Sequence, residues 1–318
     1  MNRQVAALIL NRLGISLISL IIVSFAVFFA TDMLPGDVAQ VLLGQAATEE
    51  SVAGLRQAMG LDQPAIIRFL NWMIGLLSGE MGTSYVNNIS VSEMIGDRLI
   101  NSLKLAGVAT LISVPLALTA GITAAIYRGR AFDRFISIFT ISVVSVPDFM
   151  LATASVLVFA VYLKLLPALS LVNDGQSLAD ILRNYALPVG VLSLAVSVQM
   201  IRMTRAAVID TLSKPYVEMA KLKGASTIRI VLKHALPNAV GPIANAIALS
   251  LSSLIGGVVI IETVFNYPGV AKLMVDAVAT RDLPLIQSCA MIFCFSYLLL
   301  ITLADIAGIL SNPRLRNQ

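Results

Sequence analysis

Six long apolar segments restrict the folds open to this chain. The first, residues 13–30, has no charge and is long enough to cross a hydrocarbon core of about 30 Å as a helix. It is also longer than the apolar core of about 7–15 residues in a cleaved signal peptide, which favours an uncleaved span. The chain is only 13% charged, against about 25% in soluble domains. The sequence therefore predicts an all-α integral membrane protein, with further spans at 105–126, 135–163, 185–201, 235–261 and 283–304.

The third apolar segment, 135–163, is interrupted by Pro147 and Asp148. Asp148 falls about fourteen residues into it, and an Asp at mid-bilayer costs about 2.5–3.5 kcal/mol on insertion scales. Such a side chain should face the bundle interior or a water-filled path. We expect Asp148, with Pro147 beside it, to line a substrate pathway. The open alternative is an Asp paired with a neighbouring helix or with the helix break.

Basic residues predict the orientation of the six spans. Six spans place both termini on one side, and fourteen of the 22 Lys and Arg residues lie in the segments assigned to that side, including loop 127–134. The positive-inside rule makes that side cytoplasmic. We expect three parts: residues 1–31, the N-terminus and first span; residues 32–101, a polar outer segment; and residues 102–318, a five-span core.

Residues 32–101 are predicted to carry two short helices outside the membrane. Thr48 resembles a helix start and Gly60 a helix end, and a second start is expected at 62–64, with the helix running to about Leu77. Trp72 is expected to touch the membrane interface. Farther along, Glu262 ends the fifth span near the outer face; it is a candidate gate contact, although an interfacial acid is the commoner explanation.

Residues 213–238 form the longest polar interval in the second half of the chain. Ser213 is a candidate N-cap, and Pro215 suits a first helical position. Gly224 can take a positive φ at the end of this helix, and a second amphipathic helix is expected to stop at Pro237. Helices this short are marginal in water, so they need a surface to dock on. Two surfaces remain open, a cytoplasmic partner or the inner leaflet.

The same interval resembles the EAA loop of ABC importer permeases, through Glu218-Met219-Ala220, Gly224 and Leu236-Pro237. Met219 departs from the usual Ala at its position. In that family the loop is the coupling helix that inserts into a groove of the ATPase subunit. The resemblance implies an ATPase-coupling role for Tyr216, Glu218, Met219, Ala220, Lys223, Gly224, Ala225 and Pro237.

The resemblance extends nearly from end to end and narrows to the dipeptide/oligopeptide/nickel permeases. It implies a six-span type I ABC importer permease fold and the subunit with the long outer loop after its first span. Asn312, and Pro237 where many relatives have Arg, depart from the pattern. The motifs that carry it are Leu34-Pro35-Gly36-Asp37, residues 60–64, residues 75–85, residues 256–265, Pro268-Gly269, Arg281-Asp282-Leu283-Pro284 and Pro313-Arg314.

The family implies a permease of the bacterial inner membrane that imports peptides or related solutes by alternating access. Its expected partners are a second permease in a heterodimer, two P-loop ATPases that bind ATP and Mg, a periplasmic solute-binding protein and membrane lipid. The sequence has no G-x-x-x-x-G-K-[ST] motif, so this chain is expected not to be an enzyme. Nucleic acid is not expected, because the basic residues flank apolar segments rather than forming a stripe with aromatics. A metal is not expected, because His234 and the two cysteines show no ligand spacing.

Two other classes stay open on the sequence alone. An ion-gradient-driven secondary transporter would carry several ionisable groups within its spans, and also an internal repeat. Asp148 is the one clear mid-span acid, and the sequence shows no convincing repeat. A non-transporting membrane scaffold or sensor is the other. The coupling interpretation predicts that Gly224→Asp leaves membrane insertion intact but abolishes ATPase stimulation.

Overall fold

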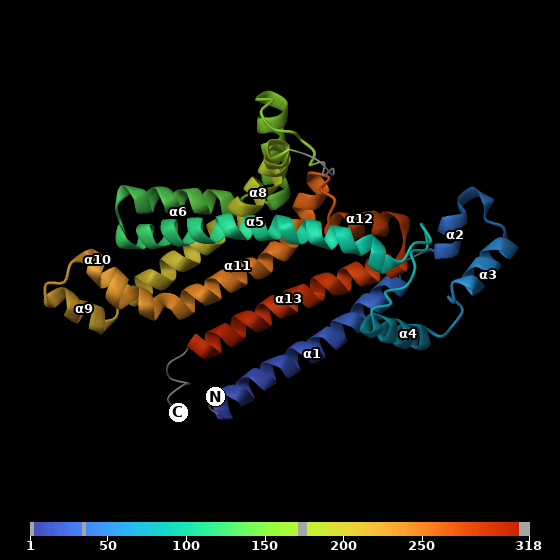
Figure 1. Ribbon diagram of the computed structural model, residues 1–318, viewed down its shortest axis with the longest axis horizontal. Helices are drawn as coiled ribbons and strands as arrows, with labels where there is room; N and C mark the ends of the chain where they lie inside the picture. The colour runs from blue at the N-terminus through green and yellow to red at the C-terminus, as the bar shows by residue number, and fades with distance from the viewer. Residues whose placement is uncertain (1–2, 34–35, 171–176, 312–318) are drawn as a thin grey trace. The chain divides into compact units, whose positions relative to one another are not determined.

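The computed structural model describes residues 3–33, 36–170 and 177–311, and within these ranges the regular elements are helices (Figure 1). Five helices are long and apolar enough to cross a membrane, and a sixth span exists if one bent pair is counted. The predicted six-span helical architecture is therefore confirmed with the bent pair as the third span. The five are α1 (Arg3–Asp32), α5 (Val91–Ile126), α8 (Leu178–Leu212), α11 (Leu236–Val264) and α13 (Leu283–Ser311).

The bent pair breaks where the sequence predicted. Helix α6 (Ala131–Val144) and helix α7 (Asp148–Ser155), which continues as the π-helical segment η2 (Val156–Tyr162), meet at 99°. Pro147 has no N–H and disfavours helical backbone at the residue before it, and α6 accordingly ends at Val144, shortly before the proline. The carbonyl of Pro147 instead accepts the N–H of Met150 at 2.9 Å and opens α7.

Two spans are longer than the apolar runs that revealed them. Helix α5 begins fourteen residues before the expected start at 105, and α8 extends beyond 185–201 at both ends. The extension of α5 carries Glu93, Asp97 and Arg98, which are polar but suit a helix that leaves the membrane. The expected division between 101 and 102 lies inside this continuous helix.

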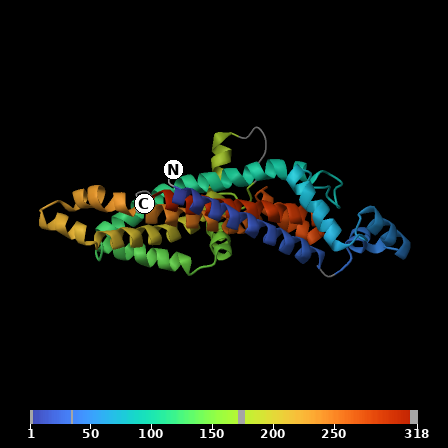
Figure 2. The same cartoon turned by 90° about the horizontal axis from the view of Figure 1, so that it is seen from below.

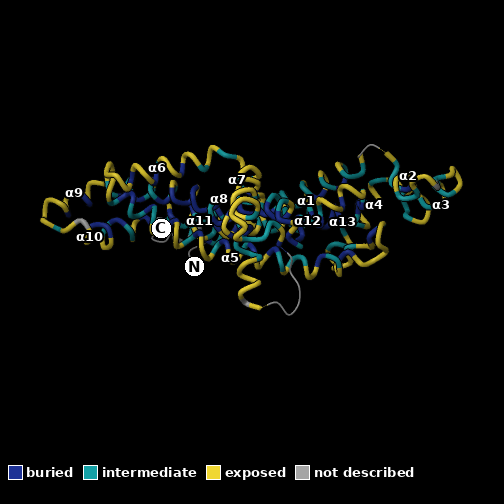
Figure 3. The backbone as a smooth tube through the Cα atoms, turned by 90° about the horizontal axis from the view of Figure 1, so that it is seen from above, coloured by how far each residue is buried: buried dark blue, intermediate teal, exposed yellow. Residues whose placement is uncertain are grey.

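The chain forms two compact units, and the first comprises residues 1–16, 104–266 and 297–318. Its most extensive packing joins α8 to α11, with α6 against α8 (Figure 3). Val208 of α8 packs near Ala239 and Ile243, whereas Leu192 lies against Gly257, so α8 and α11 run antiparallel. Small residues permit this close approach of helices.

The second unit comprises residues 17–103 and 267–296. It contains α2 (Val38–Leu43), the short 3₁₀ helix η1 (Gly44–Ala46), α3 (Glu49–Ala58), α4 (Ala65–Ser78) and α12 (Val270–Thr280). Val91, Ile95, Leu273 and Ile286 are at the centre of its core.

The two predicted outer helices are present as α3 and α4. The Thr48 side chain accepts the N–H of Ser51 at 3.2 Å, and Ser51 returns a bond in a capping box. At the second predicted start, Pro64 is the N-cap of α4 and makes no side-chain cap bond. Asp62 instead forms an ion pair with Arg56, with 3.2 Å between Asp62 Oδ1 and Arg56 Nε. Trp72 lies against Phe28, with ring centroids 5.7 Å apart.

Candidate functional site

The predicted cytoplasmic loop folds around α9 (Pro215–Leu222), which follows α8 and precedes α10 (Thr227–Ile230) (Figure 2). Pro215 occupies the first helical position, as predicted. The predicted cap at Ser213 is wrong, because Lys214 is the N-cap. Ser213 has helical backbone and closes α8, with its hydroxyl donating to the carbonyl of Asp210 at 2.7 Å.

Gly224 has the predicted left-handed backbone, with φ of +81°. Its N–H donates to the carbonyl of Lys221 at 2.9 Å, and the N–H of Ala225 donates to that of Ala220 at 3.2 Å. These two bonds form a Schellman motif, which needs a positive φ at the residue after the C-cap. Gly224 therefore fixes the direction in which the chain leaves α9.

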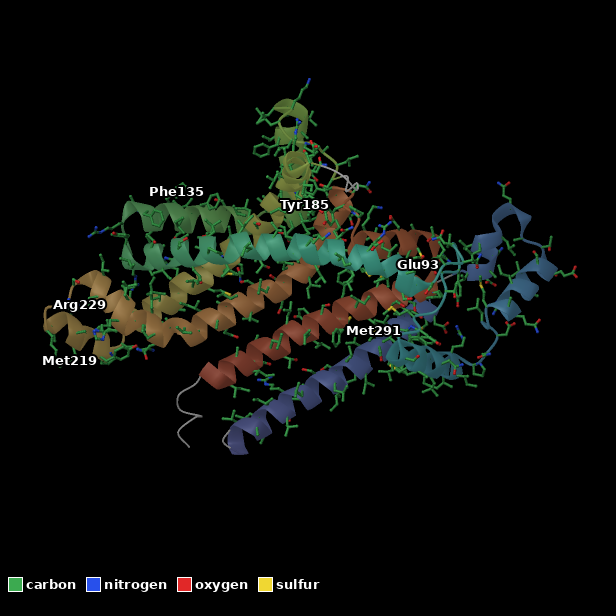
Figure 4. All side chains as sticks on the ribbon, viewed as in Figure 1. Glu93, Phe135, Tyr185, Met219, Arg229 and Met291 are labelled. Atoms are coloured by element: carbon green, nitrogen blue, oxygen red, sulfur yellow. The ribbon has the colours of Figure 1, made fainter. Side chains whose placement is uncertain are left out.

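Helix α9 has one buried face and one exposed apolar face. Val217 and Ala220 form a small core with Ile230 of α10. Tyr216, Met219 and Leu222 follow one another at three-residue spacing and are 44%, 55% and 78% exposed (Figure 4 labels Met219). We call these three side chains the α9 ridge. Among the other predicted coupling residues, Glu218, Lys223 and Pro237 are exposed and Ala225 is half-buried.

The predicted stop at Pro237 is wrong. Helix α10 continues through the π-helical segment η3 (Val231–Ala235) into α11, and Pro237 lies at the start of that helix. At this junction the N–H of Leu236 donates to the carbonyl of Val231, five residues back, and Pro237, which has no N–H, directly follows this change in hydrogen-bond pattern. His234 is half-buried in η3, and its carbonyl accepts the side-chain amide of Asn238 at 2.8 Å. The second half of the loop is thus continuous with a span.

The pathway candidates lie in different surroundings. Asp148 is the first residue of α7, directly after Pro147, is half-buried, and forms no ion pair with the residues that the structure describes. An acid in the first turn of a helix is favoured by the helix dipole. Glu262 is completely buried in α11 and is engaged with neighbouring groups, rather than exposed as an interfacial acid.

An ion pair between α6 and α8 was missed from the sequence. Arg205 Nε donates to Asp133 Oδ1 at 2.6 Å, and Nη2 donates to Oδ2 at 3.0 Å. The N–H of Gly129 also donates to Asp133, at 2.8 Å. This pair ties the start of the broken span to the helix that leads into the coupling loop. The 72-residue separation of its members left no local signal.

The motif residues of the second unit converge. Asp37 accepts the N–H of Ala39 at 2.9 Å and pairs with Arg56 at 2.9 Å. Asp282 accepts the N–H of Tyr85 at 3.1 Å and the hydroxyl of Ser84. Burial raises the pKa of the Tyr85 phenol above its ordinary value. Leu34, Pro35 and the motif residues at 312–314 lie outside the described residues.

Gly36 lies against Arg281 in the same unit. A Cβ added at Gly36 would clash with the guanidinium of Arg281, and the φ of +103° at Gly36 also disfavours other residues. The separate motifs that carry the family resemblance thus lie together in one packed cluster of loops in the second unit.

Two family profiles match the chain. Residues 117–317 match the binding-protein-dependent transport system inner membrane component, and residues 5–106 match its N-terminal membrane component. A probable peptide ABC transporter permease, y4tP, from Sinorhizobium fredii is 34% identical over 308 residues, which cover 97% of this chain and 98% of that protein. The glutathione transport system permease GsiC is 35% identical in Salmonella typhimurium (97% and 98% covered) and 36% identical in Escherichia coli K12 (94% and 95% covered).

A solved structure shows the same fold. A chain of the inward-facing MetNI methionine ABC transporter superposes with a TM-score of 0.50 at 16% identity, covering 70% of this chain and 95% of its own. At that identity the match bears on fold alone. The two profiles and the near-full-length relatives show that the chain belongs to the family of binding-protein-dependent transport system inner membrane components, the permeases of ABC importers.

Proposed function

We propose that this chain is one permease subunit of an ATP-driven importer for peptides or related small solutes in a bacterial inner membrane. It pairs with a second permease to enclose the translocation pathway. Two ATPase subunits supply ATP hydrolysis with Mg, and a periplasmic binding protein delivers the solute. The cargo class rests on the peptide and glutathione permeases among its relatives.

The α9 ridge is the observation that carries the coupling role. Its three large side chains are exposed although the other face of the same short helix is buried. An eight-residue helix gains little stability alone, so the loop is held by Val217, Ala220 and Ile230 while the ridge stays free to bind. Exposed apolar groups that line one side of a helix are typical of a surface that docks into a groove.

Basic residues support a cytoplasmic location for this end. Arg128 of the loop between α5 and α6 and Lys221 of α9 line one cavity of about 470 Å³, so both loops lie at the same end of the first unit. Loops rich in Lys and Arg stay in the cytoplasm. Arg12, near the start of α1, pairs with Asp305, near the end of α13, at 3.1 Å. The two terminal segments therefore lie side by side, which favours both termini on one side of the membrane.

The proposed cycle begins when the ATPase subunits close on ATP and displace α9. The displacement reaches α8 and α11, which are joined directly to the loop. Through the Asp133–Arg205 pair it reaches α6, and the break at Pro147 allows α7 to reorient. Asp148 would then line the pathway at the break. Glu262, which is completely buried, would stabilise the position of α11 through its contacts inside the protein.

Replacing the joint glycine tests the coupling role. Gly224→Val forces a β-branched residue into a φ of +81°, which changes how α9 is presented. Gly79→Val is the matched control, because Gly79 has a similar φ of +84° and equally open surroundings at the end of α4, outside the coupling loop. In the assembled transporter, we expect Gly224→Val to abolish stimulation of ATPase activity by loaded binding protein, and Gly79→Val to retain it.

A pull-down of the tagged chain in gentle detergent tests the partners. Recovery of a second permease and P-loop ATPases that hydrolyse ATP is expected. Normal ATPase stimulation in Gly224→Val, or a chain that elutes alone where other membrane complexes survive, would contradict the proposed function.

A further inference from the structure

Helix α8 exposes an unusual stripe for a membrane span. Between residues 187 and 209, its exposed residues are Gly190, Gln199, Arg202 and Ala206. Among the side chains of α8 that the structure describes, large exposed apolar ones occur only near its N-terminus, at Ile181 and Leu182. The part of this stripe nearer the coupling loop is therefore polar or small.

Gln199 and Arg202 open onto a groove of about 620 Å³ between α6 and α8. Ser137 and Thr140 line it from α6, beside Ile136 and Met203. Arg205 also lines the groove, but its charge is neutralised by Asp133. Arg202 forms no ion pair or hydrogen bond with the described part of the chain. The groove therefore carries one neutralised guanidinium and one free guanidinium.

The groove extends from the coupling end into the span. Arg205 is level with Asp133, the third residue of α6. Arg202 is about one helical turn farther into the span, and Gln199 lies about 9 Å from the level of Arg205 along the axis. A charged side chain facing hydrocarbon is costly, so such groups face a bundle interior or a water-filled cavity. This groove should therefore not face lipid tails.

We propose that the groove between α6 and α8 is a wall of the water-filled solute path, and that Arg202 binds a carboxylate of the transported solute. The inference rests on the proposed importer function. A planar guanidinium binds carboxylates through two parallel hydrogen bonds. Gln199 and Ser137 add neutral hydrogen-bonding groups beside it. Peptides and glutathione, the solutes named for the relatives, both carry carboxylates.

The exposure of Arg202 suits a transient contact. Exposed charge pairs are weak because water competes for both members. A solute held mainly by one such contact would be oriented in the path and then released. Arg205 has the same charge but is paired with Asp133, so among the described residues that line this groove Arg202 is the free cation.

Cysteine labelling tests whether the groove is wet. Gln199→Cys is compared with Ile138→Cys, which lies on α6, is 61% exposed and lies outside the groove lining. An anionic, membrane-impermeant methanethiosulfonate reagent is added to inside-out vesicles that contain the assembled transporter. The unmodified chain, with Cys289 and Cys294, gives the background. Gln199→Cys should react at least about tenfold faster, since thiolates form in hydrated, electropositive sites. Equal rates would overturn the proposal.

Uptake by Arg202 variants tests the carboxylate contact. A peptide with a free C-terminus is compared with the same peptide amidated, for wild type, Arg202→Ala and Arg202→Lys. Arg202→Ala should lower the efficiency of uptake of the free-carboxylate peptide by about fivefold, as the loss of an exposed charge pair allows, and affect the amidated peptide far less. Arg202→Lys should recover part of the loss. An equal loss for both peptides would overturn the carboxylate role.

Lipid composition separates the solute from a phospholipid headgroup. The same uptake is measured in vesicles of phosphatidylcholine alone and in vesicles that also contain phosphatidylglycerol. The peptide-selective loss should appear in both, whereas a loss confined to the anionic vesicles would assign Arg202 to lipid phosphate and overturn the proposal.

Assembly with the ATPases is measured for every variant. If wild-type chain brings down no ATPase, the importer function itself fails. If wild type assembles and imports peptide while Gln199→Cys stays unlabelled, only the groove assignment fails. If Arg202→Ala does not assemble, the labelling rates of Gln199→Cys and Ile138→Cys decide alone.

Discussion

Helices α1 and α8 are both long enough to cross a membrane, yet they differ in how much of their surface is buried within the chain. Only 11% of the most apolar window of α1 is buried, against 61% for α8. Leu10 and Ile22 of α1 are 69% and 62% exposed, as suits a helix in hydrocarbon. The less apolar α8 is the more buried of the two. In membrane proteins the protein interior, rather than the lipid face, tolerates polar side chains.

The largest contrast is expected between two ion pairs. Arg205–Asp133 joins α8 to α6 with the Asp133 side chain only 6% exposed, whereas Arg12–Asp305 joins α1 to α13 with side chains 50% and 30% exposed. Asp133→Asn should cost about 3–5 kcal/mol, because it leaves Arg205 without its counter-charge. Asp305→Asn should cost less than about 1 kcal/mol, because water screens that pair.

Titration with SDS in mixed micelles measures both free energies of unfolding. Equal losses of unfolding free energy for the two variants would show that the ion pair of α8 stabilises the chain no more than the ion pair of α1, and would contradict the comparison.

Leucine truncation gives the next contrast. Leu192 of α8 is 1% exposed and lies against Gly257, whereas Leu17 of α1 is 60% exposed. Leu192→Ala should cost about 2–4 kcal/mol by leaving a cavity. Leu17→Ala should change the free energy of unfolding by about 0.5 kcal/mol or less, as is usual for surface substitutions. The same titration decides, and a large loss for Leu17→Ala would mean that a partner covers α1.

A glycine replacement tests how closely α8 is packed. A Cβ at Gly121 of α5 would stand 2.9 Å from the carbonyl oxygen of Ile201, whereas one at Gly14 of α1 would meet nothing within 4 Å. Gly121→Val should destabilise the chain by about 1–3 kcal/mol through overpacking. Gly14→Val is the matched control and should be nearly neutral. Thermal melting in detergent distinguishes them, and equal melting temperatures would contradict the close contact.

The smallest effect is expected at a hydrogen bond of α1. Ser16 and Thr302 are joined at 2.6 Å, and Thr302 also donates to its own helix at Leu298. Ser16→Ala should cost about 0.6 kcal/mol, the average for hydrogen bonds between helices in a membrane. Leu13→Ala, at a 48% exposed position one turn earlier, serves as the control for truncation alone. A cost above about 2 kcal/mol would show that α1 is held mainly by polar contacts.

The spans were predictable because hydropathy reports length and polarity along the chain. Their ends were not, since a helix such as α5 continues past the apolar stretch when Glu93, Asp97 and Arg98 suit helical backbone. Helix α2 escaped notice because its six residues carry no periodic pattern. Its N-cap, Asp37, was visible in the sequence only as part of a motif.

Local chemistry explains which site features were predictable. Gly224 follows two lysines at a helix end, so its positive φ could be read from neighbouring residues. Pro237 was misassigned because proline both ends one helix and begins another, and only the π-helical segment η3 before it decides between them. The Asp133–Arg205 pair and the groove at Arg202 depend on which helices meet, which one sequence does not reveal.

Under the coupling proposed above, the hairpin of α8 and α11 would act as a lever for the coupling loop. Helices α8 and α11 pack against each other, and both are directly connected to the loop. A displacement of α9 would therefore tilt the two helices together instead of separating them. At 1.5 Å per residue, the 35 residues of α8 make an arm of about 52 Å. Pivoted at the loop, a tilt of about 5° would swing the far tip of such an arm by about 4–5 Å. Under the coupling proposed above, this hairpin would convert a small displacement of α9 into a larger movement at the far end of α8.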